Sequence, residues 1–153
     1  MTERTAEQAI IFTDGACLGN PGPGGYAALI LIGGQEQIIV GHDPATTNNK
    51  MEMTAAIRAL EALPQGLAAT IHSDSQYVVK GIREWLPGWK KRGWRTAAGE
   101  PVKNQSLWEA LDRLNSDRRI TWQWVRGHAG HEQNERVDGL ANAEAQKAAE
   151  ALR

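Results

Sequence analysis

Four acidic residues stand where the needs of a folded core alone would not place them. Asp14 shares one face of a predicted strand with the apolar Ile10 and Phe12, where a charge is costly unless it is paired or coordinated. Glu52 follows the alanine stripe of a predicted helix, Asp74 directly follows another strand, and Asp138 lies near the start of the last predicted helix. Oxygen ligands without Cys or His suit hard cations such as Mg²⁺ or Mn²⁺. Two such ions roughly 3.5–4 Å apart would clamp the attacking and leaving oxygens of a phosphoryl displacement.

These acids meet only if the chain folds in a particular way. In open α/β sheets, functional sites collect beyond the carboxyl ends of the strands. If the strands that carry Asp14 and precede Asp74 are parallel neighbours, these two side chains meet there, and two helices can add Glu52 and Asp138. Carboxylates this close repel one another strongly without a metal. The spacing therefore predicts a shared metal site.

Each acid also has a structural interpretation that the sequence leaves open. Asp74, beside Ser75, is placed to cap a helix, and Asp138 is placed to complement a helix dipole. Glu52, taken alone, is typical of a solvated helix residue. Asp14 is the hardest to explain structurally, because a Thr-Asp-Gly in an apolar strand has few uses.

A basic segment with interleaved tryptophans covers residues 80–95. It holds six basic residues and one acid, a net charge of +5, so the rest of the chain carries −6 within a total of −1. Cations bind phosphates and flat rings support sugars or bases, so the segment predicts nucleic-acid binding. For Trp85 and Trp89, spaced four residues apart, the alternative is that they anchor the helix to the body of the protein.

A small polar loop near residue 130 contains two histidines, His128 and His131. A histidine in such a loop can move protons near neutral pH. The alternative, a surface histidine without a role, stays open for both, and more so for His131. The four histidines of the chain form no zinc-binding spacing.

Apolar periodicity predicts an α/β fold: one mixed sheet covered by helices on both faces. Three strands form an antiparallel meander, and strands then alternate with helices. The turn-forming segment 18–25 separates the first two strands. Strands are expected at 9–17, 26–32, 37–41, 67–72 and 119–125, and helices at 48–63, 76–81, 83–92, 104–115 and 135–149.

Length and composition bound the remaining possibilities. The chain of 153 residues is expected to form a single domain, 1–153, with residues 1–8 as a disordered N-terminal extension. Its composition is that of a globular protein, and its longest apolar run is too short to span a bilayer. A single cysteine and the lack of a secretory signal favour the cytoplasm. Nothing marks a dimer interface, so we expect a monomer.

Five segments together resemble the bacterial ribonuclease HI branch of the RNase H family. They occur in order, cover nearly the whole chain from Ile10 onward, and match the family at every motif position. The segments are TDGACLGNPGPGGYA (13–27), TTNNKMEMTAAIRAL (46–60), SDSQYVVKGIREWLPGWKKRGW (73–94), KNQSLWEAL (103–111) and WVRGHAGHEQNERVDGLAN (124–142). The resemblance implies a five-stranded mixed β-sheet flanked by helices on both faces. It also implies Mg²⁺-dependent endonucleolytic cleavage of the RNA strand of RNA–DNA hybrids, with Mn²⁺ as a substitute, leaving 5′-phosphate and 3′-hydroxyl ends.

The resemblance also assigns roles to the acids and to one histidine. By this likeness Asp14 bridges two metal ions, and Asp138 binds the ion that activates water. Glu52 and Asp74 bind the ion on the leaving side. His128 matches a family histidine associated with proton transfer or product release.

Substrate contacts follow from the same resemblance. RNA is distinguished from DNA by its 2′-hydroxyls, which the family reads near Gly15, Cys17, Asn20, Asn48 and Gln76. Thr47 and Asn104 resemble a pocket for a DNA phosphate, and Trp85 resembles a platform for a deoxyribose. The family's basic protrusion corresponds to Lys90, Lys91, Arg92 and Arg95. Because these contacts reach backbone and sugar, little base specificity is expected.

Two other function classes remain open from the sequence. A non-catalytic hybrid-binding module would keep the basic segment but would not need the complete set of acids. A DNA-processing nuclease of the transposase type would share the sheet, but such proteins usually lack the tryptophan- and lysine-rich protrusion.

Overall fold

The computed structural model describes residues 8–126 and 132–152. The predictions for residues 1–7, His128 and His131 lie outside this part of the chain. Gln8, which the sequence analysis groups with the N-terminal extension, is described. Its side-chain oxygen accepts a hydrogen bond from the Thr70 hydroxyl at 3.2 Å.

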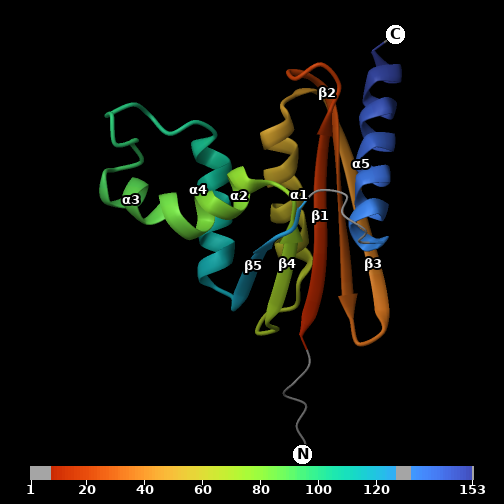
Figure 1. Ribbon diagram of the computed structural model, residues 1–153, viewed down its shortest axis with the longest axis horizontal. Helices are drawn as coiled ribbons and strands as arrows, with labels where there is room; N and C mark the ends of the chain where they lie inside the picture. Colours follow the sequence, from red (N-terminus) through yellow and green to blue (C-terminus); the bar gives the residue numbers. More distant parts are fainter. Residues whose placement is uncertain (1–7, 127–131, 153) are drawn as a thin grey trace, which may run out of the picture.

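A mixed sheet of five strands forms the centre of the molecule (Figure 1). β1 (Ala9–Cys17), β2 (Gly22–Ile32) and β3 (Gln35–Thr46) form the antiparallel meander. β4 (Ala69–Ser73) pairs parallel with β1, and β5 (Ile120–Trp124) pairs parallel with β4. The order is β3-β2-β1-β4-β5, which confirms the predicted sheet and the parallel neighbours on which the acidic site depends.

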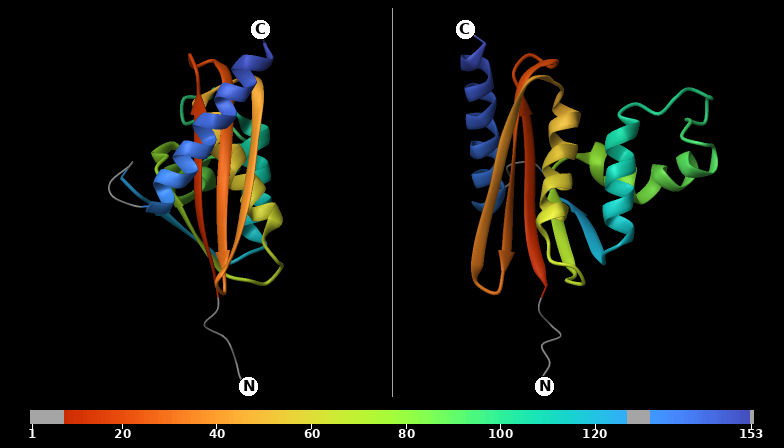
Figure 2. Two further views of the ribbon diagram at one scale, coloured as in Figure 1. Left: turned by 90° about the vertical axis from the view of Figure 1, so that its right-hand side faces the viewer. Right: turned by 180° about the vertical axis from the view of Figure 1, so that it is seen from behind.

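Helices cover both faces of the sheet, as predicted. α1 (Asn48–Ala62) lies on one face with α4 (Gln105–Ser116) beside it, and α5 (Glu132–Ala151) crosses the other face (Figure 2). α2 (Gln76–Lys80), a π-helical turn η1 (Gly81–Trp85) and α3 (Leu86–Lys91) form one helical run that leads away from the sheet (Figure 1). No helix among the described residues is both long and apolar enough to cross a membrane.

Two apolar cores hold these layers together. The larger core lies between the sheet, α1 and α4, where Met53, Leu60 and Trp108 are fully buried. The smaller core lies under α5. A Cβ on Gly25 would lie only 2.5 Å from the oxygen of Ala141 in α5, so the absence of a side chain lets this helix seat directly on β2.

The strands β2 and β3 are longer than the sequence predicts. β2 begins at Gly22, inside the segment expected to be a turn, and pairs with the end of β3 through a register shift between Gly22 and Gly24. A Cβ on Gly24 would come within 2.6 Å of Cγ2 of Thr46. The glycines therefore permit close packing as well as a turn, which composition alone does not distinguish.

Three local predictions of the helices and of β1 were wrong. The expected break near residue 82 is a continuous π turn, in which the Leu86 N–H reaches the oxygen of Gly81, five residues earlier. α5 begins at Glu132, so residues 132–134 are helical and not part of a loop. Ile10, expected on a buried face with Asp14, is 41% exposed, because α5 covers the far half of β1 only.

Candidate active site

Three of the four predicted acids lie in direct proximity. Asp14 comes from β1, Glu52 from α1, and Asp74 from the residue after β4. One carboxylate oxygen of each lies within 4.8 Å of those of the other two. Asp138, on α5, joins them through a side-chain hydrogen bond with Asp14. The fold thus brings together four acids that are far apart in the sequence.

Gly15 explains how strand and helix approach closely enough to form this cluster. A Cβ at Gly15 would lie 2.5 Å from the backbone nitrogen of Glu52, so only glycine fits between β1 and α1. Its own N–H donates to Oδ1 of Asp14 at 2.9 Å. One residue therefore both admits the helix and orients the first acid.

The structure decides between the interpretations left open for the acids. Ser75, not Asp74, is the N-cap of α2, with its hydroxyl accepting from the Val78 N–H at 3.1 Å. Glu52 is only 6% exposed and so is not a solvated helix residue. Asp138 lies beyond the first turn of α5, whose acids are Glu132 and Glu135. The purely structural interpretation therefore fails for these three acids.

The acids strongly perturb one another. Burial above all, then the charge of Asp74 and the hydrogen bond and charge of Asp138, raise the pKa of Asp14 to about 8 from its usual 3.8. Burial, followed by the charges of Asp14 and Asp74, raises the pKa of Glu52 well above its ordinary value. The pKa values are raised because negative charges are crowded together in a buried place. Such a place favours a bound positive charge, whether a proton or a cation.

The donor set fits a hard divalent cation. All the candidate ligand atoms are carboxylate oxygens, the chemistry that Mg²⁺ and Mn²⁺ favour. Oε1 of Glu52 is fully buried and has no hydrogen-bond partner among the described residues. A buried carboxylate oxygen without a partner is costly, and a cation shared with the neighbouring acids removes that cost.

Asn20 and Asn48, both matched to RNA recognition, meet at the N-terminus of α1 beside Thr47 of the DNA-phosphate pocket, whereas Gln76 begins α2. The Asn48 N–H donates to Oδ1 of Asn20 at 2.9 Å, and the hydroxyl of Thr47 accepts from the Lys50 N–H at 3.2 Å. Sγ of Cys17 lies 3.5 Å from the oxygen of Gly22. Burial raises the pKa of this thiol. The side chains of Thr47 and Asn20 thus stabilise the N-terminus of α1.

The tryptophans of the basic segment divide between two environments. Trp89 packs against the buried Trp108 with ring centroids 5.3 Å apart, as the anchoring interpretation requires. Trp85 lies at the edge of this cluster, 5.8 Å from Trp89, and lines an open hollow of about 540 Å³ together with Arg92. Trp85 is therefore anchored on one side and accessible on the other.

Asn104 adopts an unusual backbone conformation. Its φ of 59° lies in the left-handed region, and its side chain makes no cap to the helix α4 that follows. Its amide instead donates to the phenol oxygen of Tyr77 at 3.1 Å. Tyr77 also accepts from the Trp108 indole at 3.2 Å. The sequence analysis did not single out Tyr77, and only its proximity to Gln76 could have drawn attention to it.

The four basic residues of the protrusion are exposed at the far end of the helical run. Lys90 forms an ion pair with Asp112 at 3.1 Å. Nε of Arg92 donates to the oxygen of Arg95, and Arg95 donates in turn to the oxygen of Gly99 at 3.0 Å. Lys91 is exposed. These contacts stiffen the protrusion and leave its positive charge facing solvent.

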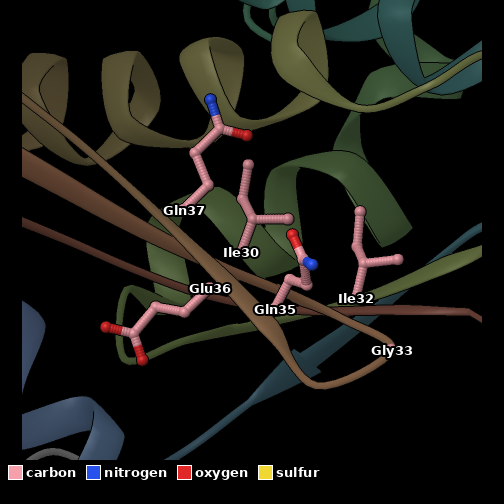
Figure 3. A pocket seen from close by; sticks show the side chains of 6 residues that line it. All are labelled: Ile30, Ile32, Gly33, Gln35, Glu36 and Gln37. Carbon is pink, nitrogen blue, oxygen red and sulfur yellow. The ribbon is translucent and has the colours of Figure 1, made fainter.

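A hollow of about 400 Å³ at the β2–β3 hairpin has a different character (Figure 3). Gln37 points from it toward the α1 side of the sheet, whereas Glu36 points the opposite way, toward α5, where it binds Arg136 (Figure 3). The hairpin lies at the amino end of β1, away from the acids. Glu36 is the one charged residue among the described residues that line this hollow, so they offer no cluster of carboxylates for a metal ion.

Comparisons with known proteins identify the family and agree with the fold. The model of the RNase H family matches residues 6–146. The ribonuclease H of Thiobacillus denitrificans is 61% identical over 138 residues, which cover 90% of this chain and 93% of that protein. The ribonuclease H of Halorhodospira halophila is 60% identical over 131 residues, 86% of this chain and 88% of that protein.

Solved structures of RNase H1 proteins are also similar to this chain in fold. LC9-RNase H1 superposes with a TM-score of 0.81 at 31% identity, covering 95% of this chain and 75% of the other. LC11-RNase H1, solved in complex with an RNA/DNA hybrid, gives a TM-score of 0.69 at 25% identity, with coverages of 92% and 99%. The fold and the converging acids define a hydrolytic nuclease of a metal-dependent class. The chain belongs to the RNase H family.

Proposed function

We propose that this protein is an endoribonuclease that hydrolyses the RNA strand of RNA–DNA hybrids, leaving 5′-phosphate and 3′-hydroxyl ends with little sequence specificity. The observation that carries the proposal is the convergence of Asp14, Glu52 and Asp74 within 4.8 Å, with a buried glutamate oxygen that lacks a partner among the described residues. The hybrid bound by LC11-RNase H1 supports the choice of substrate.

In this proposal the acids hold two Mg²⁺ ions, for which Mn²⁺ can substitute. Bound cations of this kind neutralise phosphate charge and lower the pKa of a bound water. Asp14 would bind both ions, and Asp138 would bind the ion that activates the attacking water. Glu52 and Asp74 would bind the ion next to the leaving oxygen. His128 would assist proton transfer or product release.

The chain's own contacts hold these ligands in place. The Gly15 N–H fixes one oxygen of Asp14. The Trp124 indole donates to the backbone oxygen of Asp74 at 3.2 Å, and the Val125 N–H donates to that of Ser73 at 2.9 Å. The end of β5 thereby positions the turn that carries Asp74, so that little reorganisation is needed when substrate binds.

Substrate choice would rest on separate contacts to the two strands. The RNA strand, recognised by its 2′-hydroxyls, would lie over Gly15, Cys17, Asn20, Asn48 and Gln76. The DNA strand would contact Trp85, the pocket of Thr47 and Asn104, and the protrusion formed by Lys90, Lys91, Arg92 and Arg95. We further propose that the chain acts as a single-domain monomer in the cytoplasm.

A gel assay with end-labelled substrates tests the proposal. The RNA–DNA hybrid should be cut only with Mg²⁺ or Mn²⁺, and RNA and DNA duplexes should stay intact. Asp14→Asn should abolish cleavage, whereas Asp117→Asn, an exposed acid at the end of α4, should leave it unchanged. Full activity of Asp14→Asn would reject the assigned site, and equal cleavage of a DNA duplex would favour a DNA-processing nuclease. Tight hybrid binding without turnover, even in Mn²⁺, would favour the binding module.

A further inference from the structure

A small hollow beside the acidic cluster contains two cations, Lys80 and Arg83, that have no role in the function described so far. Its volume is about 130 Å³. The indole of Trp124 forms one wall and donates to the backbone oxygen of Asp74, so the hollow directly adjoins the turn that carries this acid. The residues that line it are Gln76, Val79, Lys80, Arg83, Glu84 and Trp124.

Two cations of this hollow have no partner within the described part of the chain. Lys80 and Arg83 are exposed, and neither makes an ion pair or side-chain hydrogen bond among residues 8–126 and 132–152. Glu84, on the rim, forms no ion pair with either of them. The hollow therefore has a net positive charge, whereas the adjacent cluster is acidic.

The helix that carries these cations is locally irregular. Arg83 lies in the π turn between Gly81 and Trp85, three residues beyond Lys80. The two side chains nevertheless line the same hollow. π turns inside helices occur frequently at functional sites, because the extra residue re-aims the side chains of that turn.

The dimensions and walls of the hollow suit a phosphate group. A volume of about 130 Å³ is roughly tenfold the ~10–15 Å³ that a cavity needs to hold one water, so one phosphate can enter with part of its hydration. Val79, only 2% exposed, and the Trp124 ring give apolar walls. Gln76 adds an amide donor, and an ammonium and a guanidinium are the usual phosphate-binding groups.

We infer that this hollow binds a phosphate of the RNA strand a short distance from the bond that is cut, an inference that rests on the proposed function. An RNA strand whose cleaved bond lies at Asp74 must continue across the neighbouring protein surface. The hollow lies in that surface, beside the turn that carries Asp74. The basic protrusion around Lys91, by contrast, lies at the other end of the helical run. Lys80 and Arg83 thus strengthen binding of the cleaved strand and offset the repulsion between its phosphates and the acids.

The first test compares two charge-matched double variants. Lys80→Gln/Arg83→Gln removes the two cations of the hollow. Arg113→Gln/Arg119→Gln removes two exposed cations elsewhere, on α4 and next to the amino end of β5. Hybrid binding is measured by fluorescence anisotropy in metal-free buffer at several salt concentrations.

We expect Kd to rise about tenfold in the first variant, as a lost charge-assisted phosphate contact predicts. The slope of log Kd against log salt should decrease by about one. The control variant should change both quantities much less, and kcat at saturating hybrid should stay within about twofold of wild type in both. Equal effects of the two double variants would overturn the inference, since only general charge would then matter.

The second test locates the contact on one strand. Hybrids with a single uncharged methylphosphonate linkage, moved stepwise along the RNA or DNA strand, are bound to wild type and to Lys80→Gln/Arg83→Gln. One RNA position should weaken wild-type binding and leave the variant unaffected. Coupling at a DNA position, or at no position, would overturn the inference. Because binding is measured apart from turnover, wild type that shows this coupling but does not cleave would reject the proposed function and retain the phosphate site.

Discussion

Replacing Asp14 by Asn should stabilise the metal-free protein, by an amount that grows with pH. Burial, the charge of Asp74 and the interactions with Asp138 raise the pKa of Asp14 to about 8, whereas its ordinary value is 3.8. Between these values the folded protein keeps a proton that the unfolded chain has lost. The folded state therefore binds more protons, and its free energy of unfolding falls as the pH rises.

The size of the effect follows from the pH range between the ordinary and the raised pKa of Asp14. Each pH unit lowers the free energy of unfolding by ~1.4 kcal/mol per proton. Over about four units the loss for Asp14 amounts to on the order of 5 kcal/mol, reached above pH 8. Asn carries no charge, and its oxygen can still accept the Gly15 N–H. The variant should therefore avoid the loss without disturbing the turn.

Urea unfolding followed by tryptophan fluorescence measures this difference. Wild type, Asp14→Asn and the control Asp117→Asn are compared in EDTA from pH 5 to 9. The gap between Asp14→Asn and wild type should widen up to about pH 8 and then level off. Wild type and Asp14→Asn curves that run parallel across this range would refute the raised pKa and the close acidic cluster behind it.

Adding millimolar Mg²⁺ should narrow the stability gap between Asp14→Asn and wild type. A cation that binds only the folded state raises the melting temperature, because binding adds to the free energy of unfolding. Wild type should gain stability, and Asp14→Asn should gain much less. Equal melting temperatures of wild type in EDTA and in Mg²⁺ would count against coupling between the metal and the fold.

Two further substitutions test the packing around the site. Gly15→Ala forces a Cβ to within 2.5 Å of the backbone of α1 and should cost about 1–3 kcal/mol in urea unfolding, together with most of the cleavage activity. The matched change Gly139→Ala, on a helix position with open space, should stabilise by about 0.5–1 kcal/mol, and a similar loss at both glycines would contradict this account. Tyr77→Phe leaves the buried Trp108 indole without its acceptor and should cost about 1–3 kcal/mol, whereas an unchanged urea midpoint would show that this bond contributes nothing.

Much of the fold could be predicted because its patterns are local. Alternation located all five strands, and the stripe containing Glu52 located α1 and its buried face. The parallel pairing of β1 and β4, which the sequence analysis takes as a condition for the acidic site, is found in the sheet. Where an element is specified by its own residues, sequence reasoning reached the right result.

The errors lie where distant residues decide. The strand at Gly22 and the π turn after Lys80 depend on neighbours such as Thr46 and Trp108, which are far away in the chain. The sequence also left two interpretations of Asp74 open, as the N-cap of the following helix or as a residue of the acidic site. Only the hydrogen bond of Ser75 to the helix settles which residue caps it.

At the candidate site, residue types indicated which acids were candidates but not how they interact. The raised pKa of Asp14 and the partnerless oxygen of Glu52 arise from burial and proximity, which need the assembled layers. Tyr77 was missed for the same reason, since its two hydrogen bonds come from a loop and from a helix that follow it by about thirty residues.

The acids are distributed along the chain so that the last one, Asp138, lies on the final helix, after every strand has been made. During synthesis on the ribosome, the sheet and the basic protrusion emerge before that helix does. If the proposed function holds, a nascent chain held at this stage could already attract nucleic acid but would lack Asp138, one of the proposed metal ligands. Competence for hydrolysis would then be acquired only when α5 docks on the sheet.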